Sequence, residues 1–315
     1  MIFFNQLITG RLEADKLEGR KKLKIRSLAH VAAALLIFEI AENFSMASSE
    51  IFYRLWESMI AAEIFSVFIS VFSVVFLVRL YTVYVLKTPA QKFYIGKPVC
   101  GKLWCAAAIV MPVSVSLFYL FFVEGELRVE RLPASEAAYA VCVSLLSMGL
   151  RAAVTEEIIF RGMIQGSLKK TLGTKIALSV SALLFMLLHL VNADMNSGRE
   201  IIMICISVFI AGTALGLVTL ETGSIWSSAV IHALYNILSG ESQILHIDVE
   251  QNFPALCTYT LHSQNWMITG SRSSVGLTAA LPSIVGFSAI GLLALWKIFR
   301  RKNRQNQITT GRFRK

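Results

Sequence analysis

Long runs of apolar residues recur along this chain and restrict it to one class of fold. About 20 apolar residues in an α-helix span the roughly 30 Å hydrocarbon core of a bilayer. Such runs occur at residues 28–48, 58–83, 103–123, 138–165, 176–191, 201–220, 225–239 and 276–297. The chain is 55% hydrophobic and only 16% charged, which is unusual for a soluble domain. The sequence therefore predicts an all-α fold, a polytopic membrane helix bundle of about eight transmembrane helices.

The net charge of +10 has a simple cause in membrane orientation. Lys and Arg gather in both tails and in two connections; these basic segments are residues 10–26, 86–97, 168–175 and 300–315. The alternate connections are neutral or acidic; they are residues 48–58, 124–136, 192–200 and 240–275. Cytoplasmic loops are the ones enriched in Lys and Arg. We therefore predict a multi-pass protein of the cell membrane with both termini cytoplasmic, in contact with membrane lipids, and no nucleic-acid partner.

The chain shows no internal repeat, no low-complexity linker and no break in composition. Residues 1–315 are therefore predicted to form a single integral membrane domain. The first apolar run lacks a cleavable signal pattern, so we expect it to remain in the protein. The longest connection, residues 240–275, is either a surface loop or a segment partly ordered over the outer mouth of the bundle, because loops of this length are often functional.

Three groups of polar residues lie inside the predicted spans, where an ionisable side chain requires a partner or an aqueous cavity. The first is Glu156, Glu157 and Arg161. Glu157 and Arg161 are four residues apart, the spacing and order of a favourable helical ion pair. Glu156 is rotated by about 100° around the helix from Glu157, so it lacks that partner and is the carboxylate free for chemistry.

The second group is the stretch from Phe185 to His189, and the third contains His232 and Asn236. Glu156 and His189 both lie roughly 25 Å along their helices from the basic turn that joins them, so neighbouring antiparallel helices bring them to one level. Polar residues outside these groups, such as Glu39, Glu42 and Glu63, would pair with one another, reach toward the interface or line a substrate cavity.

Such a set of side chains has a chemical use. A carboxylate with an imidazole polarises a water for attack on a carbonyl. A second imidazole and a carboxamide donate hydrogen bonds to the oxyanion that develops. The reaction class that this predicts is amide hydrolysis.

The patterns E-E-x-x-x-R, F-x-x-x-H and H-x-x-x-N follow in this order on successive apolar runs. Together with the FRG that follows the glutamates and with Trp226, they resemble the CAAX protease and bacteriocin-processing family of intramembrane endopeptidases, also called the Abi family. The resemblance covers residues 138–240, which would be the catalytic core helices. It implies that Glu156 and His189 activate water, that His232 and Asn236 line the oxyanion site, and that Glu157 and Arg161 hold the carboxylate helix in place.

The resemblance also leaves a zinc site open, since family members are often described as metalloproteases. Glu156, His189 and His232 would supply three ligands and leave a fourth position for water. Against zinc, H-E-x-x-H is absent and the carboxamide of Asn236 is a poor zinc ligand. We favour metal-free carboxylate catalysis and assign no metal ligands.

The leading hypothesis is thus a CAAX prenyl protease-like endopeptidase that cuts a peptide or a lipidated protein. Leader-peptide maturation, bacteriocin self-immunity and regulatory peptide processing are further roles that the resemblance allows. The alternative is a non-catalytic membrane scaffold or transporter-like protein that keeps the polar cluster for stability or proton relay.

Overall fold

In the computed structural model, which describes residues 2–194, 197–249, 253–263, 265–270 and 276–312, helices account for most of the chain. A long first helix and a second helix form a hairpin: α1 (Ile2–Trp56) and α2 (Met59–Leu80), with η1 (Tyr81–Val85) as a π-helical end. A 3₁₀ turn and the third helix follow: η2 (Ala90–Phe93) and α3 (Lys102–Phe122). The helical membrane bundle predicted from the sequence is confirmed.

The central rod of the bundle is one continuous helical stretch whose winding changes four times. Its parts are α4 (Ala134–Cys142), the π-helix η3 (Val143–Arg151), α5 (Ala152–Glu156), the π-helix η4 (Glu157–Ile164) and α6 (Gln165–Leu172). The remaining helices are α7 (Thr174–His189), η5 (Leu190–Asn192), α8 (Gly198–Thr222), α9 (Trp226–Leu238), α10 (Trp266–Thr269), η6 (Gly276–Ala279) and α11 (Leu281–Arg312).

The described residues contain five helices long and apolar enough to cross a membrane, so the predicted number of eight is not confirmed. The five are Met59–Val85, Lys102–Phe122, Ala134–Leu172, Gly198–Thr222 and Leu281–Arg304. The predicted spans 176–191 and 225–239 form α7 and α9, which have only 16 and 13 residues. Helices this short do not cover a hydrocarbon core of about 30 Å.

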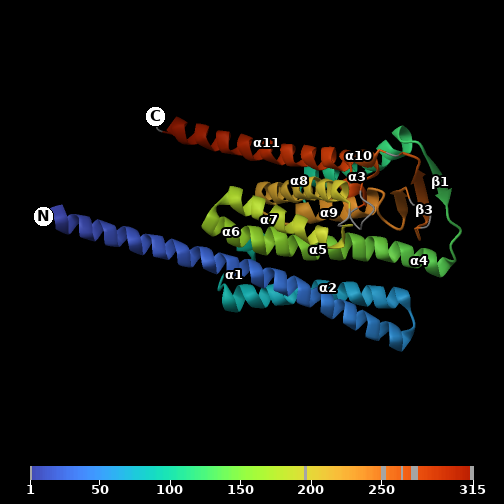
Figure 1. Cartoon of the computed structure of the whole chain (residues 1–315), viewed down its shortest axis with the longest axis horizontal. Coiled ribbons are helices and arrows are strands. Elements are labelled where there is room, and N and C mark those ends of the chain that lie inside the picture. The colour runs from blue at the N-terminus through green and yellow to red at the C-terminus, as the bar shows by residue number, and fades with distance from the viewer. Residues whose placement is uncertain (1, 195–196, 250–252, 264, 271–275, 313–315) are drawn as a thin grey trace.

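A small sheet caps the end of the bundle opposite the two termini (Figure 1), and the sequence did not predict it. Its strands are β1 (Gly125–Val129), β2 (Leu245–Asp248) and β3 (Cys257–Leu261), in the order β1-β3-β2. β1 pairs with β3 antiparallel and β2 pairs with β3 parallel. The connection 240–275 is therefore partly ordered; its residues 250–252, 264 and 271–275 lie outside the described residues.

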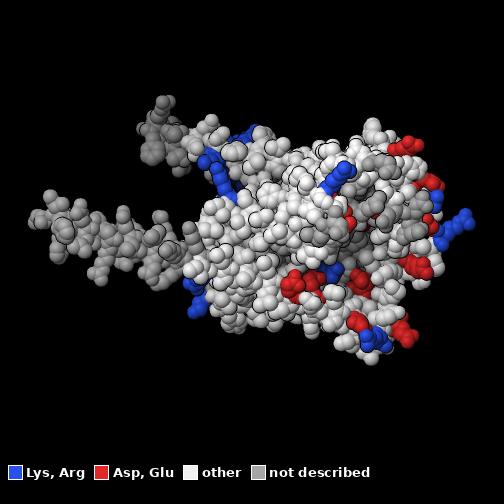
Figure 2. All heavy atoms as spheres, viewed as in Figure 1, with Lys and Arg blue, Asp and Glu red and all other residues white. Residues whose placement is uncertain are grey.

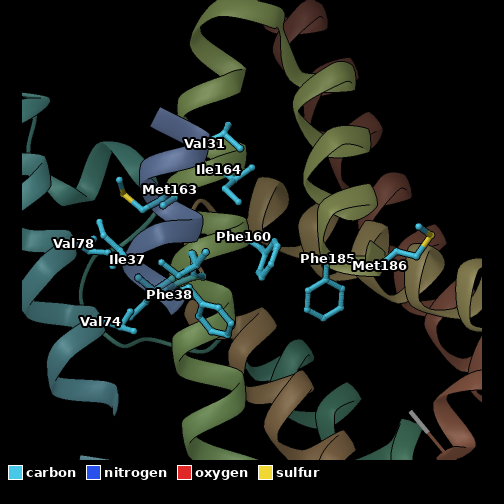
Figure 3. Packing of buried hydrophobic residues seen from close by; sticks show 14 of the residues in the cluster. Val31, Ile37, Phe38, Val74, Val78, Phe160, Met163, Ile164, Phe185 and Met186 are labelled. Atoms are coloured by element: carbon cyan, nitrogen blue, oxygen red, sulfur yellow. The ribbon is translucent and has the colours of Figure 1, made fainter. Parts of the chain in front are cut away.

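Aromatic packing fixes the central rod between its neighbours (Figure 3). Phe160 of η4 meets Phe185 of α7 edge to face, with ring centroids 5.2 Å apart, and Phe38 of α1 lies on its other side at 6.4 Å. By contrast, Phe68 and Phe72 of α2 are more than half exposed. Apolar side chains that face outward in this way are expected of a surface that contacts lipid.

Small residues of α8 let the neighbouring helices approach closely. A Cβ added to Gly212 would lie 3.2 Å from the Cα of Ala182 on α7. A Cβ added to Gly216 would lie 2.5 Å from Leu178 and 2.6 Å from Oε1 of Gln165. Close helix packing of this kind requires glycine in a membrane bundle, and it holds α7 and α8 against the central rod.

Candidate active site

The three polar groups of the sequence meet at one cavity of about 550 Å³. Glu156 from the central rod, His189 from α7, and His232 and Asn236 from α9 all line it. The expected convergence of these four side chains is present in the structure. Their roles in catalysis stay a prediction.

The two glutamates lie where the winding of the central rod changes. Glu156 is the last residue of α5, and Glu157 begins the π-helix η4. A π-helical turn closes its hydrogen bonds five residues apart instead of four, and such turns occur frequently at functional sites. The change of winding separates the two carboxylates: Glu156 lines the cavity, whereas Glu157 is completely buried beside it.

Glu157 and Arg161 form the predicted ion pair. Nη1 of Arg161 lies 3.1 Å from Oε1 of Glu157, and both side chains are at most 1% exposed. The guanidinium also stacks over the ring of Phe185 at 4.1 Å and donates to the carbonyl of Gly212 at 3.4 Å. The pair therefore joins the central rod to α7 and α8 without facing the cavity.

His232 lies between the two carboxylates. Its Nδ1 is 3.3 Å from Oε1 of Glu157, and its Nε2 is 3.9 Å from Oε2 of Glu156. Because an ionised carboxylate only accepts hydrogen bonds, Nδ1 is the protonated nitrogen toward Glu157. The sequence paired Glu156 with His189, whereas in the structure the histidine that contacts the Glu156 carboxylate is His232. The contact between His232 and Glu157 was not expected.

His189 is oriented by its own helix. Its Nδ1 lies 2.9 Å from the carbonyl oxygen of Phe185, one turn earlier, and its ring lies 4.5 Å from the Phe185 ring. Since a carbonyl oxygen cannot donate, Nδ1 carries the proton. In the neutral imidazole Nε2 then holds a lone pair, which can accept a hydrogen bond from a water in the cavity.

Asn236 is anchored to the central rod. Its Nδ2 donates to the carbonyl oxygen of Met148, in the π-helix η3, at 2.8 Å. A carboxamide nitrogen has two protons, so one remains for a group in the cavity. Oε2 of Glu156 is buried and accepts no hydrogen bond from the described residues. The cavity therefore offers an acceptor, Oε2 of Glu156, and a donor, the second amide proton of Asn236.

The side chains do not fit the three-ligand zinc site considered from the sequence. Within the described part of the chain, no three His, Cys, Asp or Glu residues form a group that would hold a metal ion. Glu157, which contacts His232, already neutralises Arg161. The proposed reaction is therefore one that the side chains carry without a metal.

Further polar residues line the cavity that the sequence did not assign to the site: Glu63, Tyr139, Ser147, Arg151, Glu241 and Thr278. Glu63 was recognised only as an acid inside a span, and it accepts a hydrogen bond from Ser147. Arg151 lies in the run 138–165, so a charge in an apolar helix was the signal that could have found it. Glu241 follows α9 in a connection, where sequence offers no such signal.

The other intramembrane acids lie in different environments. Glu42 pairs with Arg151 at 2.9 Å and accepts from Ser70 at 2.5 Å. Glu39 is exposed and contacts Asn43 of its own helix. Only Glu63, of the three acids considered at the outset, lines the candidate active site.

Glu241 is held by the segment that leads into α11. Its Oε1 accepts from the backbone N–H of Thr278 and from the hydroxyl of Thr278, the latter at 2.9 Å. Burial raises the pKa of Glu241 to about 7, although these hydrogen bonds oppose the shift. The cavity therefore contains a carboxyl group that changes charge near neutral pH.

Comparison with known proteins agrees with the motifs. Residues 138–238 match a family model described as Rce1-like, type II CAAX prenyl endopeptidase Rce1-like. No curated protein and no solved structure matches the chain. The family match supports a protease of the CAAX type, and with it a protein substrate. The chain thus carries an Rce1-like segment over residues 138–238, in agreement with the resemblance to the CAAX protease and bacteriocin-processing family.

Proposed function

We propose that the protein is an intramembrane endopeptidase that hydrolyses a peptide bond with a water activated by Glu156. The observation that carries the proposal is the buried Oε2 of Glu156, which accepts no hydrogen bond from the described residues, at a cavity shared with two histidines and a carboxamide. An ionised carboxylate is rarely left buried without a hydrogen bond. A substrate water is a partner that would satisfy it.

In this reaction Glu156 takes a proton from the water while the water oxygen attacks the carbonyl carbon of the substrate. Nε2 of His189 accepts a hydrogen bond from the other O–H of the water, which keeps its hydrogen, and so orients the nucleophile. Collapse of the tetrahedral intermediate breaks the C–N bond, and Glu156 returns its proton to the leaving amine. The carboxylate is thus regenerated, and one water is consumed for each bond cut.

Two groups would stabilise the oxyanion. Asn236 offers its second Nδ2 proton. Because Nδ1–H of His232 points at Glu157, His232 would donate from Nε2 only as an imidazolium, in which both ring nitrogens carry a proton. Glu157 and Arg161 are positioning residues: their ion pair holds the carboxylate that orients His232.

The test uses purified full-length protein in detergent micelles and a labelled peptide library. Wild type is compared with Glu156→Gln and His189→Ala, and with Glu126→Gln as a matched carboxylate-to-amide control on the exposed strand β1. We expect cleavage by wild type and by the control, and a loss of about 10²-fold or more in kcat for each site variant. Folded Glu156→Gln protein that cleaves like wild type would exclude the proposed mechanism.

A further inference from the structure

The cavity of the candidate active site extends toward one end of the bundle, the end that carries the small sheet. His189 is the last residue of α7, Tyr139 lies in α4, the first part of the central rod, and Glu241 follows the end of α9. A second hollow, of about 880 Å³, shares Glu63, Tyr139 and Arg151 with the site cavity and extends toward the turn between α1 and α2. Both spaces therefore lead toward the sheet end of the molecule.

The connections at the other end of the bundle do not contribute to the cavity. His189 lies fifteen positions along α7 from Thr174, the residue with which that helix begins at the far end. At about 1.5 Å per residue, this is a distance of roughly 22 Å along the axis of α7. None of the described residues that line the cavity comes from the connections 86–102 and 168–175. The described cavity lining therefore extends toward the sheet end and not to the connections of the far end.

The two ends differ in their positive charges. The connections at the far end carry seven lysines and no carboxylate: Lys87, Lys92, Lys97, Lys102, Lys169, Lys170 and Lys175. The connections at the sheet end contain no lysine; in residues 48–58, 123–136 and 190–200 the positive residues are Arg54, Arg128, Arg131 and Arg199. Figure 2 shows Lys and Arg at both ends of one face, whereas the carboxylates lie over its middle and its sheet end and none lies over the end from which α1 and α11 project.

The far end also contains a carboxylate, Glu221, that forms ion pairs with basic residues of α11. Glu221, at the end of α8, lies 2.9 Å from Nη2 of Arg301 and 3.4 Å from Nζ of Lys297, and it accepts from the indole of Trp104 at 2.9 Å. This carboxylate therefore ties α3, α8 and α11 together at the basic end. It does not offset the seven lysines of the connections.

An excess of Lys and Arg in short connections marks the cytoplasmic side of a membrane protein. We propose that the catalytic cavity opens on the non-cytoplasmic side of the membrane. The substrate is then an exported peptide, or the outer juxtamembrane segment of a membrane protein, rather than a prenylated C-terminus in the cytoplasm. This inference rests on the proposed function for its substrate, but the orientation itself is independent of catalysis.

The orientation is tested with single cysteines in a variant whose five native cysteines are replaced by alanine. Glu130→Cys lies at the sheet end and Lys97→Cys at the far end, and both positions are exposed. Intact cells are treated with a membrane-impermeant maleimide. We expect labelling of Glu130→Cys in intact cells, and of Lys97→Cys only after permeabilisation; the reverse pattern overturns the proposal.

A second measurement keeps the native cysteines. Green fluorescent protein fused after Lys315 fluoresces only if that end of α11 is cytoplasmic, so a dark fusion of full length also overturns the proposal. The peptide that is cut fastest in detergent is then added to sealed vesicles. We expect cleavage by right-side-out vesicles and loss of cleavage with inverted ones, with Glu156→Gln as the inactive control.

The two proposals fail in different ways. Cleavage only by inverted vesicles refutes the outward opening while the enzyme reading stands. Absence of any cleavage in detergent refutes the enzyme reading, whereas the cysteine labelling still decides the orientation.

Discussion

Breaking the buried pair of Glu157 and Arg161 one partner at a time is expected to destabilise the protein strongly. Their charged atoms are 3.1 Å apart and the side chains are at most 1% exposed. With an effective dielectric constant of about 20, Coulomb's law gives an attraction of about 5 kcal/mol at this distance. Glu157→Gln leaves a buried guanidinium without its counter-charge, and Arg161→Met leaves a buried carboxylate, each at a cost of about 3–5 kcal/mol.

The double substitution Glu157→Gln with Arg161→Met removes both charges at once. Because no unpaired charge remains, we expect the double variant to be more stable than the sum of the single effects, with a coupling energy of about 3 kcal/mol. The contact between Arg161 and Phe185, at 4.1 Å, is lost in Arg161→Met and in the double variant alike, so it cancels from this coupling.

The free energy of unfolding is measured by denaturant titration in detergent micelles. The exposed pair of Glu50 and Arg54 has the same four-residue spacing, with side chains 63% and 73% exposed, and serves as the matched control. The same two substitutions there should give no measurable coupling. Single variants at Glu157 and Arg161 that lose less than about 1 kcal/mol, or losses that simply add in the double variant, would refute the reasoning.

Four other outcomes are expected. Asn236→Ala should lower kcat by about 10²-fold with little change in KM, because the second amide proton of Asn236 would act only on the transition state. A fall of about 10²-fold in the affinity for an uncleaved substrate analogue would argue against that role. Gly212→Val should lower the free energy of unfolding by about 1–3 kcal/mol, because a Cβ at this position lies 3.2 Å from the Cα of Ala182. Gly198→Ala is the control and should cost little, because a Cβ there meets nothing within 4 Å. Equal melting temperatures of the two variants would contradict this. The pKa of Glu241 is raised to about 7 in the folded protein, so folding favours its protonated form. Its contribution to the free energy of unfolding, about 3 kcal/mol, is therefore present below pH 4.5 and is lost as the pH rises toward 7. Glu241→Gln should flatten this pH dependence in unfolding curves measured from about pH 4.5 to 8. Removal of metal ions with a chelator should leave peptide cleavage unchanged, and recovery of lost activity by added zinc would refute metal-free catalysis.

Helix periodicity predicted the local part of the site well. The spacing of Glu157 and Arg161 gave their ion pair, and the rotation between adjacent residues placed Glu156 toward a different space. The common level of Glu156 and His189 followed from the length of two helices that share a turn. These relations are local, since each is fixed by helix geometry and by a short connection.

The relations that involve α9 could not be obtained in this way. The contacts of His232 with both glutamates depend on how α9 crosses the central rod and on the change to π-helical winding at Glu157. The sheet joins residues 125–129 to residues 257–261, which are more than a hundred residues apart. Short strands of four or five residues carry too little pattern to predict such a pairing.

The amino-acid sequence alone determined that this chain is a helical membrane bundle, which residues are too polar for lipid, and which of them share a helical face, because apolar length and helical period act over a few turns. The tertiary structure decided that His232 lies between the two carboxylates, which additional residues line the cavity, and toward which end of the bundle that cavity extends. Those properties arise from the packing of helices that are distant in sequence, and packing depends on the shapes of all the side chains between them.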